Sequence, residues 1–128
     1  MGQVGDDPFG HHLAGVLEEE GVDISGLRYS TEARTALAFV SLTKEGERSF
    51  VFYRHPSADM LMSPEQVAIE VLTGKQIFHF GSITLIHEPS RSATLMAARA
   101  AHTNGMLISY DPNLRPRCGR APRQRVRE

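Results

Sequence analysis

The feature that most constrains the fold of this chain is a strand–helix–strand pattern between residues 77 and 115. One apolar run ends at Gly81-Ser82, and a second run at residues 106–110 breaks into Asp-Pro-Asn-Leu-Arg. The residues between them, 89–104, have helical character, and Gly105 follows where a helix often ends. Two short apolar runs joined by one helix are typical of a right-handed βαβ unit with parallel strands. The sequence therefore predicts an α/β fold.

Polar residues follow both of these strands at their carboxyl ends. Ligands of open parallel sheets bind beyond this edge, because the loops that leave the strands meet there. The ends are Gly81-Ser82 and residues 111–115, which are the most polar parts of the unit. We therefore expect a small-molecule site built from Ser82, Asp111, Asn113 and Arg115.

Composition places the chain among globular proteins of about one domain. Its 128 residues are 41% hydrophobic and 23% charged. No apolar run approaches the ~20 residues that span a bilayer, and residues 2–7 are too polar for a signal peptide. The single cysteine, Cys118, excludes an internal disulfide framework and is typical of a reducing compartment. We expect a cytoplasmic protein with no membrane partner.

The charge is distributed unevenly along the chain. The net charge of −1 combines −6 on residues 1–114 with +5 on residues 115–128, where six arginines lie. A basic segment of this kind can bind nucleic-acid phosphates. This one has no aromatic residue for base stacking and no helical periodicity. We favour disordered or non-homologous sequence over a nucleic-acid partner for residues 115–128.

The remaining elements are read from periodicity and from turn residues. Residues 1–4 resemble the end of an element, and Asp6 or Asp7 can cap the helix that follows. The expected elements are a helix at 8–20, a short strand at 27–30, an antiparallel hairpin at 35–54 and a short helix from Ser63 to Leu72. A lone hairpin is marginally stable in water, so this one must pair with other strands or cover something.

Isolated reactive residues give no catalytic or metal signature. The six histidines match no metal-ligand spacing, and we predict no metal site. His79 lies inside an apolar strand, where we expect a hydrogen-bonded core residue. Ser82 lacks the Gly-x-Ser-x-Gly context of a nucleophilic serine. We therefore assign neither nucleophilic nor metal chemistry to these residues.

Four strings of residues resemble one known family in the same order. They are Val-Gly-Asp-Asp-Pro-Phe-Gly at 4–10, Ala-Arg-Thr-Ala-Leu-Ala-Phe-Val at 33–40, Phe-Tyr-Arg with Ser-Ala-Asp-Met-Leu at 52–61, and Phe-His-Phe-Gly-Ser at 78–82 followed by Asp-Pro-Asn-Leu-Arg at 111–115. Together they resemble the PfkB, or ribokinase-like, sugar kinases, and among these the plant-type fructokinases. The resemblance covers residues 1 to about 116.

This resemblance implies a fold and a function. It implies a partial Rossmann-like parallel sheet with helices over residues 1–114, plus a small antiparallel β lid at 35–54 that covers the sugar and can pair two subunits. The βαβ unit spans about 77–115. The implied activity is the ATP-dependent phosphorylation of fructose to fructose 6-phosphate with Mg²⁺, in the cytosol or the plastid.

The resemblance also implies roles for individual residues. Phe52 and Arg54 would reach the sugar from the lid, and Ser82 and Ile83 would form the pocket wall. Arg115 would contact substrate or phosphate, held in place by the turn from Asp111 to Asn113. A ketohexose needs several directed hydrogen bonds and an apolar wall, and arginine offers a rigid fork of donors.

The chain departs from the family where phosphoryl transfer needs it most. The family's base and anion cradle come from a Gly-Ala-Gly-Asp string, whereas this chain has no Gly-x-Gly and its single Gly-Asp lies at residues 5–6. The family's amino-terminal strand and Gly-Gly sugar-binding turn are also unmatched. We therefore assign no catalytic residue here, and we expect neither good binding of ATP and Mg²⁺ nor turnover by this chain alone.

Three hypotheses follow for the function of the chain. It is an internal fragment of a fructokinase that supplies the lid and part of the sugar pocket, with a tail from a frameshift or a misjoined exon. Alternatively, it is a non-catalytic module that pairs with full-length subunits through the lid. The third hypothesis is a truncated gene product with no function.

Overall fold

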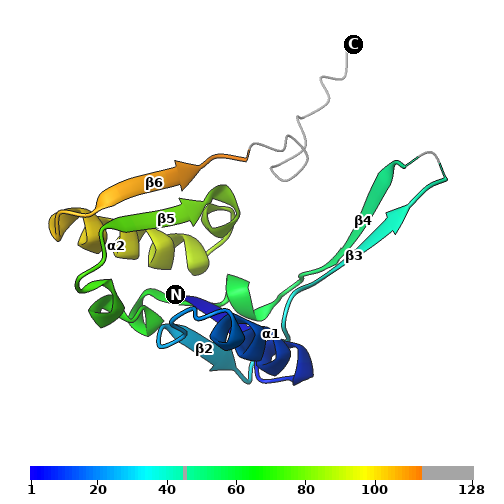
Figure 1. The fold of residues 1–128 in the computed structure, drawn as a ribbon, viewed down its shortest axis with the longest axis horizontal. Helices are drawn as coiled ribbons and strands as arrows, with labels where there is room; N and C mark the ends of the chain where they lie inside the picture. Colours follow the sequence, from blue (N-terminus) through cyan, green and yellow to red (C-terminus); the bar gives the residue numbers. More distant parts are fainter. Residues whose placement is uncertain (45, 114–128) are drawn as a thin grey trace, which may run out of the picture.

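The computed structural model describes residues 1–44 and 46–113, which form three separate two-stranded sheets and two α-helices (Figure 1). Strand β1 (Gly2–Gly5) pairs in parallel with β2 (Leu27–Ser30). Strand β5 (Ile77–Gly81) pairs in parallel with β6 (Leu107–Asp111). The predicted α/β class and the parallel βαβ unit are confirmed. Strand β1 itself was not predicted, because residues 1–4 are too few to show alternation.

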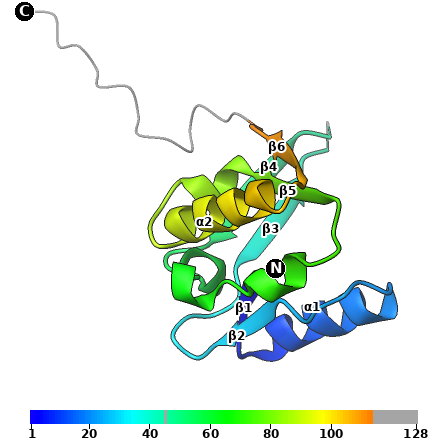
Figure 2. The same cartoon turned by 90° about the vertical axis from the view of Figure 1, so that its left-hand side faces the viewer.

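The predicted hairpin is confirmed and stands apart from the two parallel sheets. Strand β3 (Leu37–Leu42) pairs antiparallel with β4 (Arg48–Tyr53). Figure 1 shows the hairpin projecting from the body, on the side toward which β5 and β6 point, and Figure 2 shows it from the end. We call this hairpin the lid. Arg115 and the predicted tail at 115–128 lie outside the described residues.

Helix α2 (Ser90–Thr103) covers one face of the β5–β6 sheet with small side chains. Its buried residues include Ala93, Ala97 and Ala101, four positions apart, which lets the helix approach the sheet closely. The core beside them contains Leu72, Ala101 and Met106, with Phe78 and Ile108 packed against it. The face of α2 that packs on the sheet is therefore rich in alanine.

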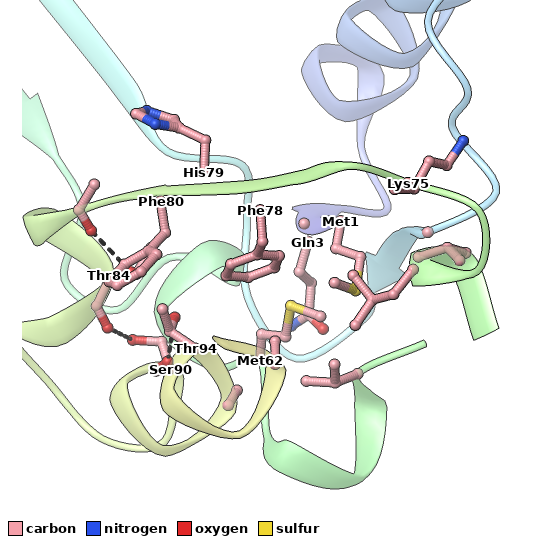
Figure 3. A pocket seen from close by; sticks show the side chains of 18 of the residues that line it. Met1, Gln3, Met62, Lys75, Phe78, His79, Phe80, Thr84, Ser90 and Thr94 are labelled. Carbon is pink, nitrogen blue, oxygen red and sulfur yellow. Dashed lines mark hydrogen bonds between the residues drawn. The ribbon is translucent and has the colours of Figure 1, made fainter. Parts of the chain in front are cut away.

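His79 corrects one prediction about this sheet. It is hydrogen-bonded as expected, with Nδ1 3.0 Å from Ser109 Oγ on the paired strand, but it is exposed rather than buried. Successive side chains on a strand point to opposite faces, so Phe78 and Phe80 face α2 while His79 faces away (Figure 3). Among the described residues, that second face has no covering layer.

Helix α1 (Pro8–Glu19) begins at Asp7, one of the two caps that the sequence offered. The Asp7 Oδ1 atom accepts hydrogen bonds from the backbone N–H groups of Phe9, at 3.0 Å, and Gly10, at 2.9 Å. The helix buries its small residues Gly10 and Ala14, while its larger apolar side chains, such as Phe9 and Leu13, stay exposed. Contact between α1 and β1 therefore depends on residues with little or no side chain.

The short helix expected from Ser63 to Leu72 is wrong in type. The structure has two 3₁₀ segments instead, Pro64–Gln66 and Ile69–Leu72. Val67 between them is extended, with φ −74° and ψ 117°, which interrupts any α-helical run. Branched side chains at Val67, Ile69 and Val71 lower the helix propensity of this segment. The expected start is correct, since Gln66 Oε1 accepts a hydrogen bond from the Ser63 backbone at 2.9 Å.

Buried hydrogen bonds fix the point where the chain enters the lid. Thr35 donates from its backbone N–H to Asp7 Oδ2 at 2.8 Å and from its hydroxyl to Asp7 Oδ1 at 2.9 Å. The same hydroxyl accepts from the Gly5 backbone at 2.9 Å. Hydrogen bonds from the backbone of Thr35 and Gly10 lower the pKa of Asp7 from 3.8 to about 2. Asp7 therefore joins α1, the end of β1 and the start of the lid.

We predict that Asp7 makes stability pH-dependent in acid. Its pKa is lower in the folded chain, so the unfolded chain binds more protons between pH 4 and 2. Stability from Asp7 is therefore complete above this window and lost as the pH falls through it. Asp7→Asn should be less stable than wild type at pH 7, and the difference should shrink toward pH 2. Urea denaturation across this range measures it. Asp6→Asn, at an exposed site, is the control, and an equal loss there would contradict the assignment.

We also predict opposite effects for two glycine substitutions in α1. Alanine has the higher helix propensity, by about 1 kcal/mol. A Cβ at Gly10 would clash with the carbonyl oxygen of Gly5, whereas one at Gly15 meets nothing within 4 Å. Gly15→Ala should stabilise the chain, and Gly10→Ala should destabilise it because helix and strand must separate. Thermal unfolding followed by circular dichroism measures both. Equal melting temperatures for the two variants would refute the close approach.

Candidate functional site

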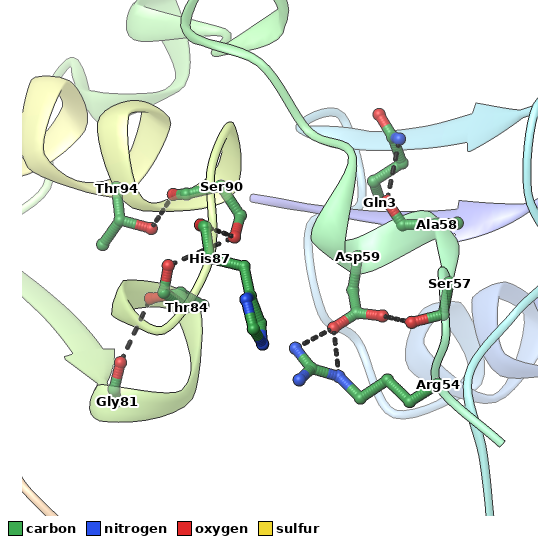
Figure 4. Close-up of polar contacts among 10 residues, drawn as sticks. All are labelled: Gln3, Arg54, Ser57, Ala58, Asp59, Gly81, Thr84, His87, Ser90 and Thr94. Atoms are coloured by element: carbon green, nitrogen blue, oxygen red, sulfur yellow. Dashed lines mark hydrogen bonds and ion pairs between the residues drawn. The ribbon is translucent and has the colours of Figure 1, made fainter. Parts of the chain in front are cut away.

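Arg54 lies just past the end of β4 and is held by one carboxylate. Its Nε and Nη2 atoms donate to Asp59 Oδ2 at 2.9 and 2.5 Å (Figure 4). The other carboxylate oxygen, Oδ1, accepts from the Ser57 hydroxyl at 2.5 Å. A guanidinium carries five N–H donors, and these two bonds leave three of them for other acceptors.

The segment that carries Asp59 is buried and tied to the body. Ser57 is 2% exposed and Ala58 is fully buried. The Ala58 backbone N–H donates to the Arg34 carbonyl at 2.9 Å, and Gln3 Nε2 donates to the Ala58 carbonyl at 2.9 Å. Both ends of the lid are therefore bonded at its base, through Thr35 at the entry and residues 57–59 at the exit.

Two of the predicted sugar-binding residues, Phe52 and Arg54, line one hollow at the base of the lid. This hollow, of about 590 Å³, is also bordered by Arg34, Phe39 and Tyr53. The aromatic side chains give it an apolar wall, and the arginines give it donors. This combination of one apolar face and a few directed donors fits a polyhydroxylated ligand such as a sugar.

The other predicted residues gather at the carboxyl ends of β5 and β6. Gly81 pairs with Asp111 in the parallel register, so the residues that follow both strands are neighbours. Ser82 and Ile83 begin the 3₁₀ helix η4 (Ser82–Leu85) directly after β5. Asp111 Oδ1 accepts from the Asn113 backbone at 2.9 Å, and Asn113 has a φ of 28°. Asp111 and Asn113 are exposed, and Arg115 lies outside the described residues.

A second hollow, of about 510 Å³, lies between the two parallel sheets (Figure 3). Gln3 of β1 lines it, together with Phe78 and Phe80 of β5, while Ala93 and Ala97 of α2 form part of its floor. Strands β1 and β5 each have one partner strand in the described part of the chain, so each offers a free edge. Both strands line this hollow.

Asp59 is the residue that connects the two hollows. It lines the hollow between the sheets, while its partner Arg54 lines the hollow at the lid. Ser82, Ile83, Asp111 and Asn113 line neither hollow. The structure thus gathers the predicted residues into two groups, one at the lid and one at the strand ends, and whether they bind one ligand stays a prediction.

Asp59 and Ser57 are the residues of this arrangement that the sequence reasoning left without a role. Both lie in the Ser-Ala-Asp string that follows Arg54 by three to five residues. A carboxylate so close to an arginine is a usable signal, but proximity in sequence does not show that both carboxylate oxygens are engaged. His87 also projects toward the Arg54 side in Figure 4.

The helix amino ends do not fit a nucleotide phosphate. At α1 the carboxylate of Asp7 already accepts from the free N–H groups of Phe9 and Gly10. At α2 the Glu88 carboxylate accepts from the Ser92 backbone at 3.1 Å. Within residues 1–44 and 46–113 there is also no group of three or more metal-ligating side chains. At both helices a carboxylate therefore already accepts from backbone N–H groups that a phosphate would use.

No helix in the described part of the chain is both long and apolar enough to cross a membrane.

Comparison with known proteins finds fructokinases among the relatives. The chain is 55% identical over 115 residues to "Probable fructokinase-4" of Arabidopsis thaliana, covering 90% of this chain and 35% of the relative. It is 53% identical over the same length to "Fructokinase" of Solanum tuberosum, again covering 35% of that protein. The chain thus spans about a third of the length of these curated relatives.

Solved structures show the same fold. The fructokinase from Xylella fastidiosa matches with a TM-score of 0.84 and 38% identity, over 97% of this chain and 38% of that one. The Vibrio cholerae O395 fructokinase in its fructose, ADP and calcium ion bound form matches with a TM-score of 0.78 and 35% identity, over 97% of this chain and 40% of the other. The family model described as pfkB family carbohydrate kinase matches residues 1–128, and the chain belongs to this family.

Proposed function

We propose that this chain supplies the lid and one wall of a hexose pocket in an enzyme that phosphorylates fructose with ATP, giving fructose 6-phosphate. The observation that carries this proposal is Arg54, which is fixed by Asp59 beside Phe52 while three of its donors stay available. The similarity to fructokinases of 53–55% identity supports fructose as the hexose.

The chemistry of the two residue groups suits the two sides of a sugar ring. From the lid, Arg54 donates hydrogen bonds to sugar hydroxyls, and Phe52 packs on the C–H face. From the strand ends, Ser82, Asp111 and Asn113 offer hydroxyl, carboxylate and amide groups, and Ile83 adds an apolar contact. We place Arg115 with this second group. Closure of the lid over the sugar would exclude water and strengthen each of these polar contacts.

ATP and Mg²⁺ enter this proposal as reactants of the whole reaction. One related crystal structure is that of the Xylella fastidiosa fructokinase with bound ATP. The amino ends of α1 and α2 are already occupied by carboxylates, so we route no step of phosphoryl transfer through them. We place the reaction in the cytosol or the plastid stroma, and one relative, from Arabidopsis thaliana, is named as chloroplastic.

The test is a titration of the ¹⁵N-labelled chain with fructose, followed by NMR. We expect shifts at Phe52 and Arg54 in the lid and at Gly81 and Ser82 at the strand end. Arg54→Ala should weaken binding roughly tenfold or more, because hydrogen bonds from a charged donor contribute about 1.5–3 kcal/mol.

Arg28→Ala is the matched control, since Arg28 is an exposed arginine on β2 that lines neither hollow. It should bind fructose like wild type. Shifts confined to one group of residues would show that the lid and the strand ends do not share a sugar. An Arg54→Ala chain that binds like wild type would remove the lid from the site.

We propose a second role for the lid, as a surface that pairs with another subunit. Apolar side chains lie exposed on both of its faces, with Phe39 and Val51 on one and Val40 and Phe52 on the other, each 52–60% exposed. A sugar can cover only one face of so thin an element. Exposed apolar strands with free edges are typical of sites that pair with a further chain.

Sedimentation velocity tests this second role. We expect the purified chain to form dimers, and Val51→Lys should shift it to monomers because the lysine places a charge in the interface. Leu13→Lys makes the same change on the exposed face of α1 and should leave the dimer intact. A wild-type chain that stays monomeric at high concentration, or an equal effect of the two variants, would count against pairing through the lid.

A further inference from the structure

The contact between Arg54 and Asp59 is more constrained than a surface ion pair. The Arg54 side chain is 17% exposed and that of Asp59 is 37% exposed. Two N–H groups of Arg54 converge on a single oxygen, Oδ2 of Asp59. Because one of these donors is Nε, the contact fixes the plane of the guanidinium. Rotation about the Cδ–Nε bond would break a hydrogen bond to Asp59.

Asp59 itself is prevented from turning away. Its second oxygen accepts from Ser57, which is 2% exposed. The peptide between Ser57 and Asp59 is bonded on one side to Gln3 of β1 and on the other to the Arg34 carbonyl at the lid entry. A chain of hydrogen bonds therefore runs from the body of the protein, through residues 57–59, to the guanidinium.

This arrangement leaves the outer donors of Arg54 on the edge of the guanidinium away from Asp59. The bonds to Asp59 use the Nε side of the guanidinium, so both N–H groups of Nη1 and one of Nη2 stay available. Arg54 lines the hollow at the lid, whereas Asp59 lines the other hollow. The Asp59 carboxylate thus holds the guanidinium from outside the hollow at the lid.

We propose that Asp59 is a positioning residue for sugar recognition, and that it acts through Arg54 rather than by touching the sugar. This inference rests on the proposed function and deepens it. A free arginine must give up rotamer freedom when it binds a hydroxyl, whereas a guanidinium already fixed in place loses much less. Asp59 therefore adds to sugar affinity without contributing a contact of its own.

A double-mutant cycle tests this claim on fructose affinity measured by NMR titration. Asp59→Asn keeps the shape but removes the charge, and it should weaken fructose binding about tenfold, which corresponds to ~1.4 kcal/mol. The same change in an Arg54→Ala background should have no further effect, because the positioned group is already gone. Asp59→Glu restores the charge and should recover part of the affinity.

A second readout reports on Arg54 without any sugar. The ¹⁵N–¹H signal of its Nε–H group is sensitive to the hydrogen bond with Asp59. It should move and broaden in Asp59→Asn, and it should shift less in Ser57→Ala, where the carboxylate keeps its charge but loses one support. Asp23→Asn is the matched control, since Asp23 pairs with Lys75 at an exposed site and should leave the Arg54 signal unchanged. The backbone amide spectrum of each variant checks that the chain is folded.

The outcomes separate this inference from the proposed function. A wild-type chain that binds no fructose overturns the proposed function, and the Nε–H signal then decides whether Asp59 positions Arg54. An unchanged Nε–H signal in Asp59→Asn overturns the positioning role. So does a loss of fructose affinity that persists in the Arg54→Ala background, because Asp59 would then act on the sugar by itself.

Discussion

One carboxylate, that of Asp7, holds together two parts of this chain that are separate in sequence. It accepts hydrogen bonds from Phe9 and Gly10 at the start of α1 and two more from Thr35 at the entry to the lid. Four donors on one buried carboxylate explain why its pKa falls to about 2. The placement of the lid on the body depends on this group at one end and on residues 57–59 at the other.

The lid is therefore anchored at its base and unsupported along its length. Its two strands pair with each other, and their apolar side chains are exposed on both faces. A two-stranded hairpin gains little stability by itself in water. Arg54 lies at the anchored base of this element. The arrangement therefore separates the exposed hairpin from the group proposed to recognise the sugar.

Periodicity and turn residues were enough to predict the elements with strong local signals. The hairpin at 35–54, the helix after Asp7 and the βαβ unit are all present, because alternation, capping and glycine stops act within a few residues. The segment from Ser63 to Leu72 was predicted as a helix because its capping signal outweighed its branched side chains. The prediction that His79 is buried was wrong, because the sequence of a strand does not reveal which of its faces is covered.

The candidate site also has a part that the sequence predicts and a part that it does not. The ends of the strands can be predicted from sequence, and Gly81 and Asp111 do pair. The hydrogen bonds between Arg54 and Asp59 cannot be predicted from sequence, because they depend on how the chain turns after β4 and on which oxygen each donor reaches. Resemblance to a family identified the residues of the lid, and the structure showed that the Asp59 carboxylate holds Arg54. That the lid and strand-end groups bind one sugar stays a prediction, because the two groups do not line a common hollow.

The free edges of β1 and β5 have a consequence for how this chain behaves. Residues of both strands line the same hollow, whose floor includes alanine side chains. Each free edge leaves backbone donors and acceptors without a partner strand in the described part of the chain, and such edges are where extended polypeptides pair. Unrelated chains would also adhere at these edges. The unpaired backbone groups of β1 and β5 therefore affect both the solubility of the chain and the extension of its sheets.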